Sequence, residues 1–176
     1  MGGKTEIPSG KVTFEKFGMQ AYFPENEWEY ETSEMKIPGF KGECVNAYLK
    51  KSGEVIGNKT KYSVYISFIR FASTFENDAA ANKRIDEIKE SYDYYTVIEI
   101  EEGKEYLSVD PIKSSQIGDY EAKLMKCKKI NGSMEESYFI YQGKKLYWIA
   151  VVIPEDKISD YYAGCMEIIN TLKITD

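Results

Sequence analysis

Residues 118–176 read GDYEAKLMKCKKINGSMEESYFIYQGKKLYWIAVVIPEDKISDYYAGCMEIINTLKITD and contain the strongest structural signals of the chain. Three strands are predicted there, over 120–130, 134–141 and 146–153, separated by turns at Asn131-Gly132 and Gln142-Gly143-Lys144. Asn-Gly favours the positive φ angles of a type I′ hairpin turn. The segment therefore predicts an antiparallel meander of three strands.

The last of these strands is apolar on both of its alternating faces. A strand with one wet face alternates apolar and polar residues, whereas a strand covered on both faces does not. Pro154 ends the strand because proline has no N–H to donate to a ladder. We therefore expect other parts of the protein to cover both faces of this strand. One face carries Leu146, Trp148, Ala150 and Val152, and the other carries Tyr147, Ile149, Val151 and Ile153.

An amphipathic helix follows Pro154. Apolar residues recur there at spacings of three and four, which makes one stripe. Glu155 and Asp156 stand at its start, where the helix dipole favours negative charge. Gly164 costs about 1 kcal/mol of helix stability relative to alanine and suggests close packing on the sheet. The stripe consists of Ile158, Tyr161, Tyr162, Cys165, Ile168, Ile169 and Leu172.

Upstream of this block, the pattern predicts one more helix among several strands. The helix spans 78–92 with the stripe Ala81, Ile85, Ile88 and Tyr92, and it starts from a Ser73/Glu76 capping box or from Asn77 or Asp78. The order of elements predicts an α+β fold, a three-layer α-β-α sandwich whose mainly antiparallel central sheet carries helices on both faces. The predicted strands are 12–17 and 19–23 (a hairpin or one kinked strand), 43–49, 61–71, 96–100 and 106–109, with a loop over 32–41 and a polar turn region over 51–59.

Length and charge limit the domain organisation and the partners. The 176 residues suit a single domain over 12–176, preceded by a flexible N-terminal tether over 1–11. The formal net charge is −6 and the basic residues are dispersed, which argues against a nucleic-acid partner. No stretch approaches the roughly 20 apolar residues of a membrane span, so no transmembrane segment is expected.

The residue types offer little catalytic chemistry. The chain has no histidine, which excludes the usual Ser-His-Asp and Cys-His arrangements. Residues 53–60 miss the P-loop spacing and precede a strand, so we interpret them as a hairpin loop. The chain is therefore expected to lack a catalytic, cofactor or metal site, and a carboxylate-dependent enzyme is the last-ranked alternative. Four acidic residues surround a turn and are interpreted as a solvated rim: Glu99, Glu101, Glu102 and Glu105.

The three cysteines, Cys44, Cys127 and Cys165, are too widely spaced for a disulfide framework. We interpret them as small buried apolar residues. A pair between Cys44 and Cys127 is the alternative if their strands are neighbours.

Tyr92, Tyr94 and Tyr95 form the one candidate interaction patch. They cluster where the middle helix meets a strand. One or two of them are expected in the core, because tyrosine suits sheet cores, and any exposed member would suit a contact surface.

Four short features resemble the PsbP-like fold family. They are the strand Met19–Pro24 followed by Trp28, the middle helix after a long strand, Gly118–Ala122, and the helix end Ile169–Ile174. Members of that family include an extrinsic photosystem II subunit, a factor that binds the Ran GTPase, and bacterial exported lipoproteins. The resemblance implies a non-enzymatic interaction domain, and it transfers no functional residue.

Two functional hypotheses follow. The first is a non-catalytic domain that binds a protein or a small ligand outside the cytoplasm, with its full-length form tethered to a membrane. The second is a cytoplasmic adaptor or regulatory domain, which unpaired cysteines and an acidic balance also fit.

Overall fold

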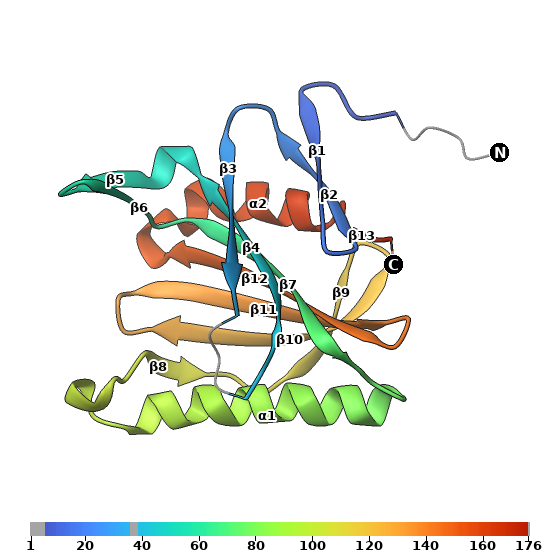
Figure 1. Ribbon diagram of the computed structural model, residues 1–176. Coiled ribbons are helices and arrows are strands. Elements are labelled where there is room, and N and C mark those ends of the chain that lie inside the picture. The colour runs from blue at the N-terminus through green and yellow to red at the C-terminus, as the bar shows by residue number, and fades with distance from the viewer. Residues whose placement is uncertain (1–5, 36–38, 176) are drawn as a thin grey trace.

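The computed structural model describes residues 6–35 and 39–175. The fold is α+β, with a mainly antiparallel sheet and two helices, α1 (Asp78–Val97) and α2 (Ile158–Ile169) (Figure 1). The largest sheet has eight strands, and all of its neighbours pair antiparallel. Its order is β3 (Trp28–Glu34), β4 (Gly42–Leu49), β7 (Tyr65–Thr74), β12 (Lys145–Pro154), β11 (Ser133–Gln142), β10 (Tyr120–Lys129) and β8 (Tyr106–Val109), with β9 (Lys113–Ile117) also paired to β10.

Two smaller sheets accompany it. One joins the N-terminal hairpin to the C-terminal strand, in the order β1 (Lys11–Lys16), β2 (Met19–Pro24) and β13 (Lys173–Ile174). The other is the hairpin β5 (Gly53–Ile56) and β6 (Lys59–Tyr62), which projects from the body of the protein (Figure 1). Short 3-10 turns complete the chain at η1 (Lys50–Ser52), η2 (Ile100–Glu102) and η3 (Glu155–Lys157).

The predicted meander is confirmed as β10, β11 and β12, but the type I′ turn lies elsewhere. Gly143 and Lys144 both have positive φ, 57° and 64°, and form the two-residue loop between β11 and β12. Asn131 is not among the described non-glycine residues with positive φ; Gly132 alone has it, at 85°. The Gly132 N–H donates to the Lys129 carbonyl at 3.0 Å, so this loop is a type I turn followed by a left-handed glycine.

Several predicted boundaries are wrong in the polar segments. No strand covers 96–100, because α1 continues through Val97, where the Thr96 hydroxyl donates to the Asp93 carbonyl at 2.6 Å within the helix. The region 51–59 contributes β5, and β3 occupies the start of the expected loop 32–41, of which residues 36–38 lie outside the described part. Asn77 caps α1, since its side chain accepts from the Ala80 N–H at 3.0 Å.

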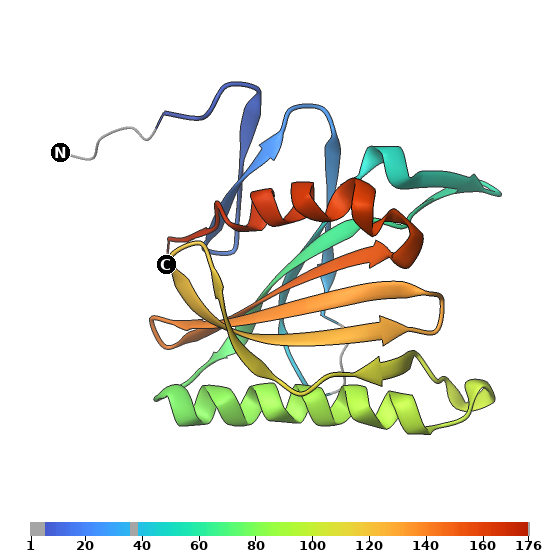
Figure 2. The same ribbon diagram turned by 180° about the vertical axis from the view of Figure 1, so that it is seen from behind.

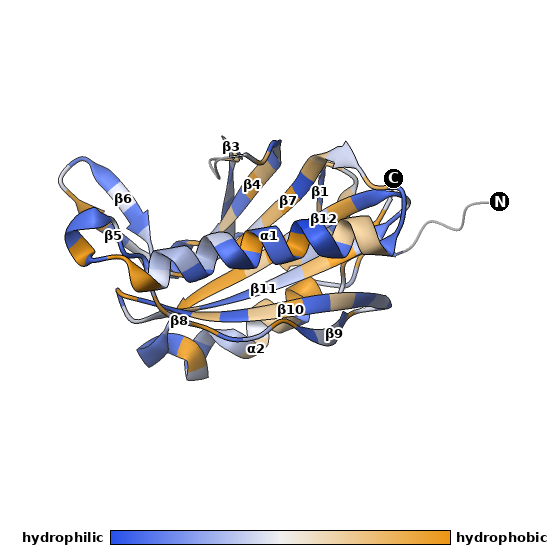
Figure 3. Cartoon of the chain, turned by 90° about the horizontal axis from the view of Figure 1, so that it is seen from below, coloured by the Kyte–Doolittle hydropathy of each residue, from blue (hydrophilic) through white to orange (hydrophobic). Residues whose placement is uncertain are grey.

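The buried side chains form two hydrophobic clusters, and each contains one helix. Trp148 is 2 % exposed and Tyr147 is 0 % exposed, which confirms that β12 is covered on both of its faces. Figure 3 shows α1 lying across the strands on the side nearest the viewer. The α1 cluster includes Leu146, Trp148 and Ala150 with Ala81, Ile85, Ile88 and Tyr92; the α2 cluster includes Tyr147, Ile149, Val151 and Ile153 with Cys165, Ile168 and Ile169.

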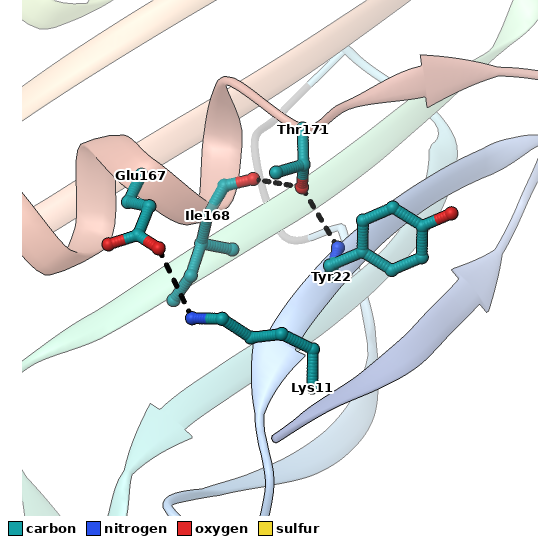
Figure 4. Close-up of polar contacts among 5 residues, drawn as sticks. All are labelled: Lys11, Tyr22, Glu167, Ile168 and Thr171. Atoms are coloured by element: carbon teal, nitrogen blue, oxygen red, sulfur yellow. Dashed lines mark hydrogen bonds and ion pairs between the residues drawn. The ribbon is translucent and has the colours of Figure 1, made fainter. Parts of the chain in front are cut away.

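The end of α2 is tied to the N-terminal hairpin (Figure 4). The Thr171 hydroxyl donates to the Ile168 carbonyl at 2.6 Å, and its oxygen accepts from the Tyr22 N–H at 2.9 Å. Lys11 Nζ lies 3.2 Å from Glu167 Oε1. Residues 1–5 of the expected tether lie outside the described residues, and Lys11 is already the first residue of β1.

The β9–β10 turn meets the same corner (Figure 2). The Gly118 N–H donates to Asn170 Oδ1 at 3.1 Å, and the Ile174 N–H donates to the Tyr120 hydroxyl at 2.8 Å. Gly118 has a φ of 53°, and a Cβ there would lie 2.8 Å from the Asn170 carbonyl oxygen, so this approach requires glycine. Three of the four segments that carry the PsbP-like resemblance thus pack against one another.

The described cysteines Cys44, Cys127 and Cys165 are buried and free. A Cys44–Cys127 disulfide is ruled out, because three strands separate β4 from β10 in the sheet. Across residues 6–35 and 39–175, neither helix combines the length and the apolar character that a bilayer crossing requires.

Candidate functional site

The structure separates the three tyrosines of the predicted patch. Tyr92 is buried in the α1 cluster and stacks on Tyr106 with ring centroids 4.6 Å apart. Tyr95 is half-buried beside the same cluster, and Tyr94 is 58 % exposed. Tyr94 and Tyr95 still touch edge to face at 5.3 Å. The interaction patch therefore remains a prediction. Of its three tyrosines, only Tyr94 and part of Tyr95 are accessible to a partner.

Exposed apolar side chains continue beyond Tyr94. Val97 ends α1, Ile100 lies in η2 and Leu107 lies on β8, and all three are exposed. We call residues 94–107 the turn segment. Its acidic residues are exposed as well, as the sequence pattern indicated: Glu99, Glu101, Glu102 and Glu105.

A second feature is a hollow of about 660 Å³ on the α1 side of the sheet, called here the tyrosine hollow. Tyr48 pairs with Tyr65 across β4 and β7, and Asn46 pairs with Ser67, so these four side chains share one face. That face also carries Ile69 of the α1 cluster, two residues along β7. The lining residues are Glu31, Asn46, Tyr48, Thr60, Lys61, Tyr62, Tyr65, Ser67 and Lys129.

Ring contacts and hydrogen bonds hold the lining of the hollow in place. Tyr48 stacks on Tyr62 of the β5–β6 hairpin with centroids 4.9 Å apart, and it contacts Tyr65 at 5.9 Å. The Ser67 hydroxyl donates to Asn46 Oδ1 at 2.6 Å, and Asn46 Nδ2 donates to Ser33 Oγ at 3.3 Å. The amide is therefore oriented before any ligand arrives.

Lys129 connects the hollow to a buried carboxylate. Glu135 is 6 % exposed, pairs across the strands with Cys127, and leaves Oε2 without a hydrogen-bond partner. Burial raises the pKa of Glu135, although Lys129 and hydrogen bonds from Tyr92 and Cys127 lower it. Burial lowers the pKa of Lys129. Nearby groups, chiefly Tyr65 and Glu135, raise that pKa by more than burial lowers it, so the net shift is upward. Lys129 therefore remains a cation between Glu135 and the hollow.

A second buried glutamate lies on the other face of β11. Glu136 is 2 % exposed, and its Oε2 accepts from the Tyr138 hydroxyl at 2.7 Å and the Tyr162 hydroxyl at 2.9 Å. Lys126 Nζ lies 3.6 Å from Glu136 Oε1. Burial and the hydrogen bond to Glu136 raise the pKa of Tyr162 to about 12. These partners make Glu136 a hydrogen-bonded part of the α2 side.

The remaining chemistry of the described residues is limited. Burial raises the pKa of the Cys165 thiol to about 12 and also raises that of Cys127, so neither thiol is a ready nucleophile. No group of three or more potential metal ligands occurs within residues 6–35 and 39–175. A smaller cavity of about 210 Å³ lies between Trp28, Leu49 and Cys165, with Gly164 at its lining.

Sequence reasoning missed the tyrosine hollow. Its residues come from β3, β4, β6, β7 and β10, and β3, β5 and β6 lack a strong apolar period. The signal in the sequence was a group of three tyrosines at positions 48, 62 and 65. Their spacing matches neither one helix nor one strand, so the sequence did not place them together.

The fold is PsbP-like. The solution structure of cyanobacterial PsbP (CyanoP) from Synechocystis matches with a TM-score of 0.60 at 10 % identity, over 99 % of this chain and 97 % of that one. A crystal structure from Bacteroides thetaiotaomicron matches with a TM-score of 0.52 at 11 % identity, over 96 % of this chain. The chain spans only 50 % of that second protein. No protein-family model and no curated protein matches the sequence.

Proposed function

We propose that this chain is a non-catalytic protein-binding domain, built as a three-layer α-β-α sandwich with the central sheet between its helices. The two clusters, each containing a different helix, support the layered arrangement. The PsbP-like fold supports an interaction role through the family resemblance described above.

The turn segment carries this proposal. Tyr94, Val97, Ile100 and Leu107 are four of the nine large apolar side chains that are exposed in the described part of the chain. Apolar and aromatic residues surrounded by charge are typical of interfaces between proteins. Because four of the five charges in the turn segment are carboxylates, the partner presents an apolar centre with a basic rim.

The buried acids support a non-catalytic role. Glu135 and Glu136 are adjacent on β11, so their side chains point to opposite faces of the sheet. They cannot act as an acid–base pair on one substrate. The raised thiol pKa values of Cys127 and Cys165 point the same way.

For location, we propose action outside the cytoplasm, with the residues that precede β1 as a tether. The support is the resemblance to exported members of the PsbP-like fold family. Cell fractionation tests this: recovery of the native protein in the cytosolic fraction would favour the adaptor alternative, which the three free cysteines also fit.

A charge placed in the turn segment tests partner binding. Val97 is 78 % exposed and Val55, on the β5–β6 hairpin, is 77 % exposed, so Val97→Asp and Val55→Asp are matched in exposure and chemistry. In affinity capture from cells of the source organism, Val97→Asp should lose the partner and Val55→Asp should keep it. Capture by wild type should also weaken as salt rises, because the rim charges are exposed. Full capture by Val97→Asp would refute the proposed docking site.

A further inference from the structure

The tyrosine hollow has the dimensions and composition of a small-ligand site. Its volume of about 660 Å³ falls within the range of about 300–1,000 Å³ typical of ligand pockets. It is built on the face of the large sheet, and β6 of the β5–β6 hairpin supplies one part of its lining. The sheet fixes Tyr48, Tyr65 and Asn46 relative to one another through the β4–β7 register.

The lining offers both apolar faces and hydrogen-bonding groups. Tyr48, Tyr62 and Tyr65 supply flat rings whose hydroxyls donate and accept. Asn46 and Ser67 lie between the rings and the α1 cluster as a hydrogen-bonded pair. A ligand for such a site has C–H faces to lie on the rings and several hydroxyls to meet the polar groups.

The charges of the hollow oppose one another. Lys129, the innermost cation, is already matched by Glu135, and Glu105 also raises its pKa. At the rim, Glu31 and Lys61 carry opposite signs. Because the lining carries both signs, an anionic or a cationic ligand would meet a like charge here, whereas a neutral ligand would not.

We propose that the tyrosine hollow binds a short neutral saccharide. The pyranose C–H face packs on the Tyr48–Tyr62 stack, the sugar hydroxyls exchange hydrogen bonds with Asn46 and Tyr65, and one of them accepts from Lys129 Nζ. This site is separate from the turn segment, so it does not depend on the docking proposed above.

Saturation-transfer NMR on the intact chain tests the proposal with named probes. The neutral probes are maltose, cellobiose and N,N′-diacetylchitobiose, and the charged comparators are galacturonic acid and glucose 6-phosphate. At least one neutral disaccharide should show saturable transfer at millimolar concentration, and the charged sugars should bind more weakly.

Two variants locate the binding. Tyr62→Ala removes one ring of the stack from an exposed hairpin and should weaken the bound disaccharide about tenfold or more. Tyr94→Ala removes an exposed tyrosine of the turn segment and should leave the affinity unchanged. The chemical shifts of each variant away from the substitution show whether it is folded. The proposal is overturned if no neutral disaccharide binds, if only the charged sugars bind, or if Tyr62→Ala binds as wild type does.

Discussion

Glu135 and Glu136 are neighbours on β11, are both buried, and have contrasting environments. Glu136, on the α2 side, has two tyrosine hydroxyls on one carboxylate oxygen and Lys126 on the other. Glu135, on the α1 side, leaves one carboxylate oxygen without a hydrogen bond and depends on Lys129, which also lines the tyrosine hollow. A buried glutamate therefore has partners for both carboxylate oxygens on the α2 side, whereas on the α1 side one carboxylate oxygen has no hydrogen bond.

This contrast separates a part of the protein optimised for packing from a part that retains an unfavourable group. A buried polar atom without a partner costs free energy, and such groups in native proteins call for an explanation. On the α1 side, Ser137 Oγ and Trp148 Nε1 are also without hydrogen-bond partners. All three atoms belong to the face that carries the hollow, which is where a binding role would compensate for lost stability.

The largest effect is expected from Glu136→Leu. The substitution leaves the hydroxyls of Tyr138 and Tyr162 without their acceptor inside the α2 side, so the free energy of unfolding should fall by about 3 kcal/mol. Urea unfolding followed by tryptophan fluorescence measures it. An unchanged unfolding midpoint would show that the hydrogen bonds of Glu136 contribute nothing to stability. The contrast between Glu136 and Glu135 would then be unsupported.

The two lysines of β10 give a second, smaller contrast. Lys129→Met leaves Glu135 buried without its cation and should cost about 2 kcal/mol at pH 8 and less at pH 5, because burial raises the pKa of this carboxyl group and falling pH favours its neutral form. Lys126→Met is the matched control. Its side chain is 40 % exposed, and without it Glu136 still accepts from two tyrosine hydroxyls, so the loss should be about 0.5 kcal/mol. Equal losses in the two variants would show that the two faces do not differ.

Glu135→Gln should have a smaller effect than Lys129→Met, and of the opposite sign. Burial holds the folded-state pKa of Glu135 above its unfolded value, so the group favours the folded state while protonated and loses that contribution as pH rises through the raised pKa. The glutamine variant lacks this loss and should be more stable than wild type by about 1 kcal/mol at pH 8, with a smaller difference at pH 5.

Denaturant unfolding at the two pH values checks this prediction. Glu136→Gln serves as its control and should be less stable than wild type at both values, because an amide is a weaker acceptor for the two hydroxyls. A Glu135→Gln variant that is less stable at pH 8 than at pH 5, relative to wild type, would contradict the assigned role of burial.

The sequence predicted those parts of the fold whose periodicity is strong. The stripe Ala81, Ile85, Ile88 and Tyr92 is the buried face of α1, and the two-sided apolar strand is β12. Helical geometry also separates Tyr92 from Tyr94, which lie about 200° apart around α1. Grouping them as one patch overlooked that angle.

The tyrosine hollow and the burial of Glu135 and Glu136 could not be predicted from the periodicity of the sequence. A glutamate pair in a strand predicts one buried and one exposed side chain only when the sheet has one wet face, and here both are buried. The hollow depends on the register of β4 with β7 and on a projecting hairpin, which are long-range pairings that local patterns do not encode.

The pairing of β13 with β2 has a consequence for how the protein is made. The Thr171–Tyr22 hydrogen bond in that corner joins residues 149 positions apart. On the ribosome, the first hairpin therefore emerges long before Lys173 and Ile174 exist, and the edge of β2 that pairs with them stays open through most of translation. An unpaired strand edge is a template for pairing with another chain, so this edge is the surface that a chaperone would shield on the nascent chain.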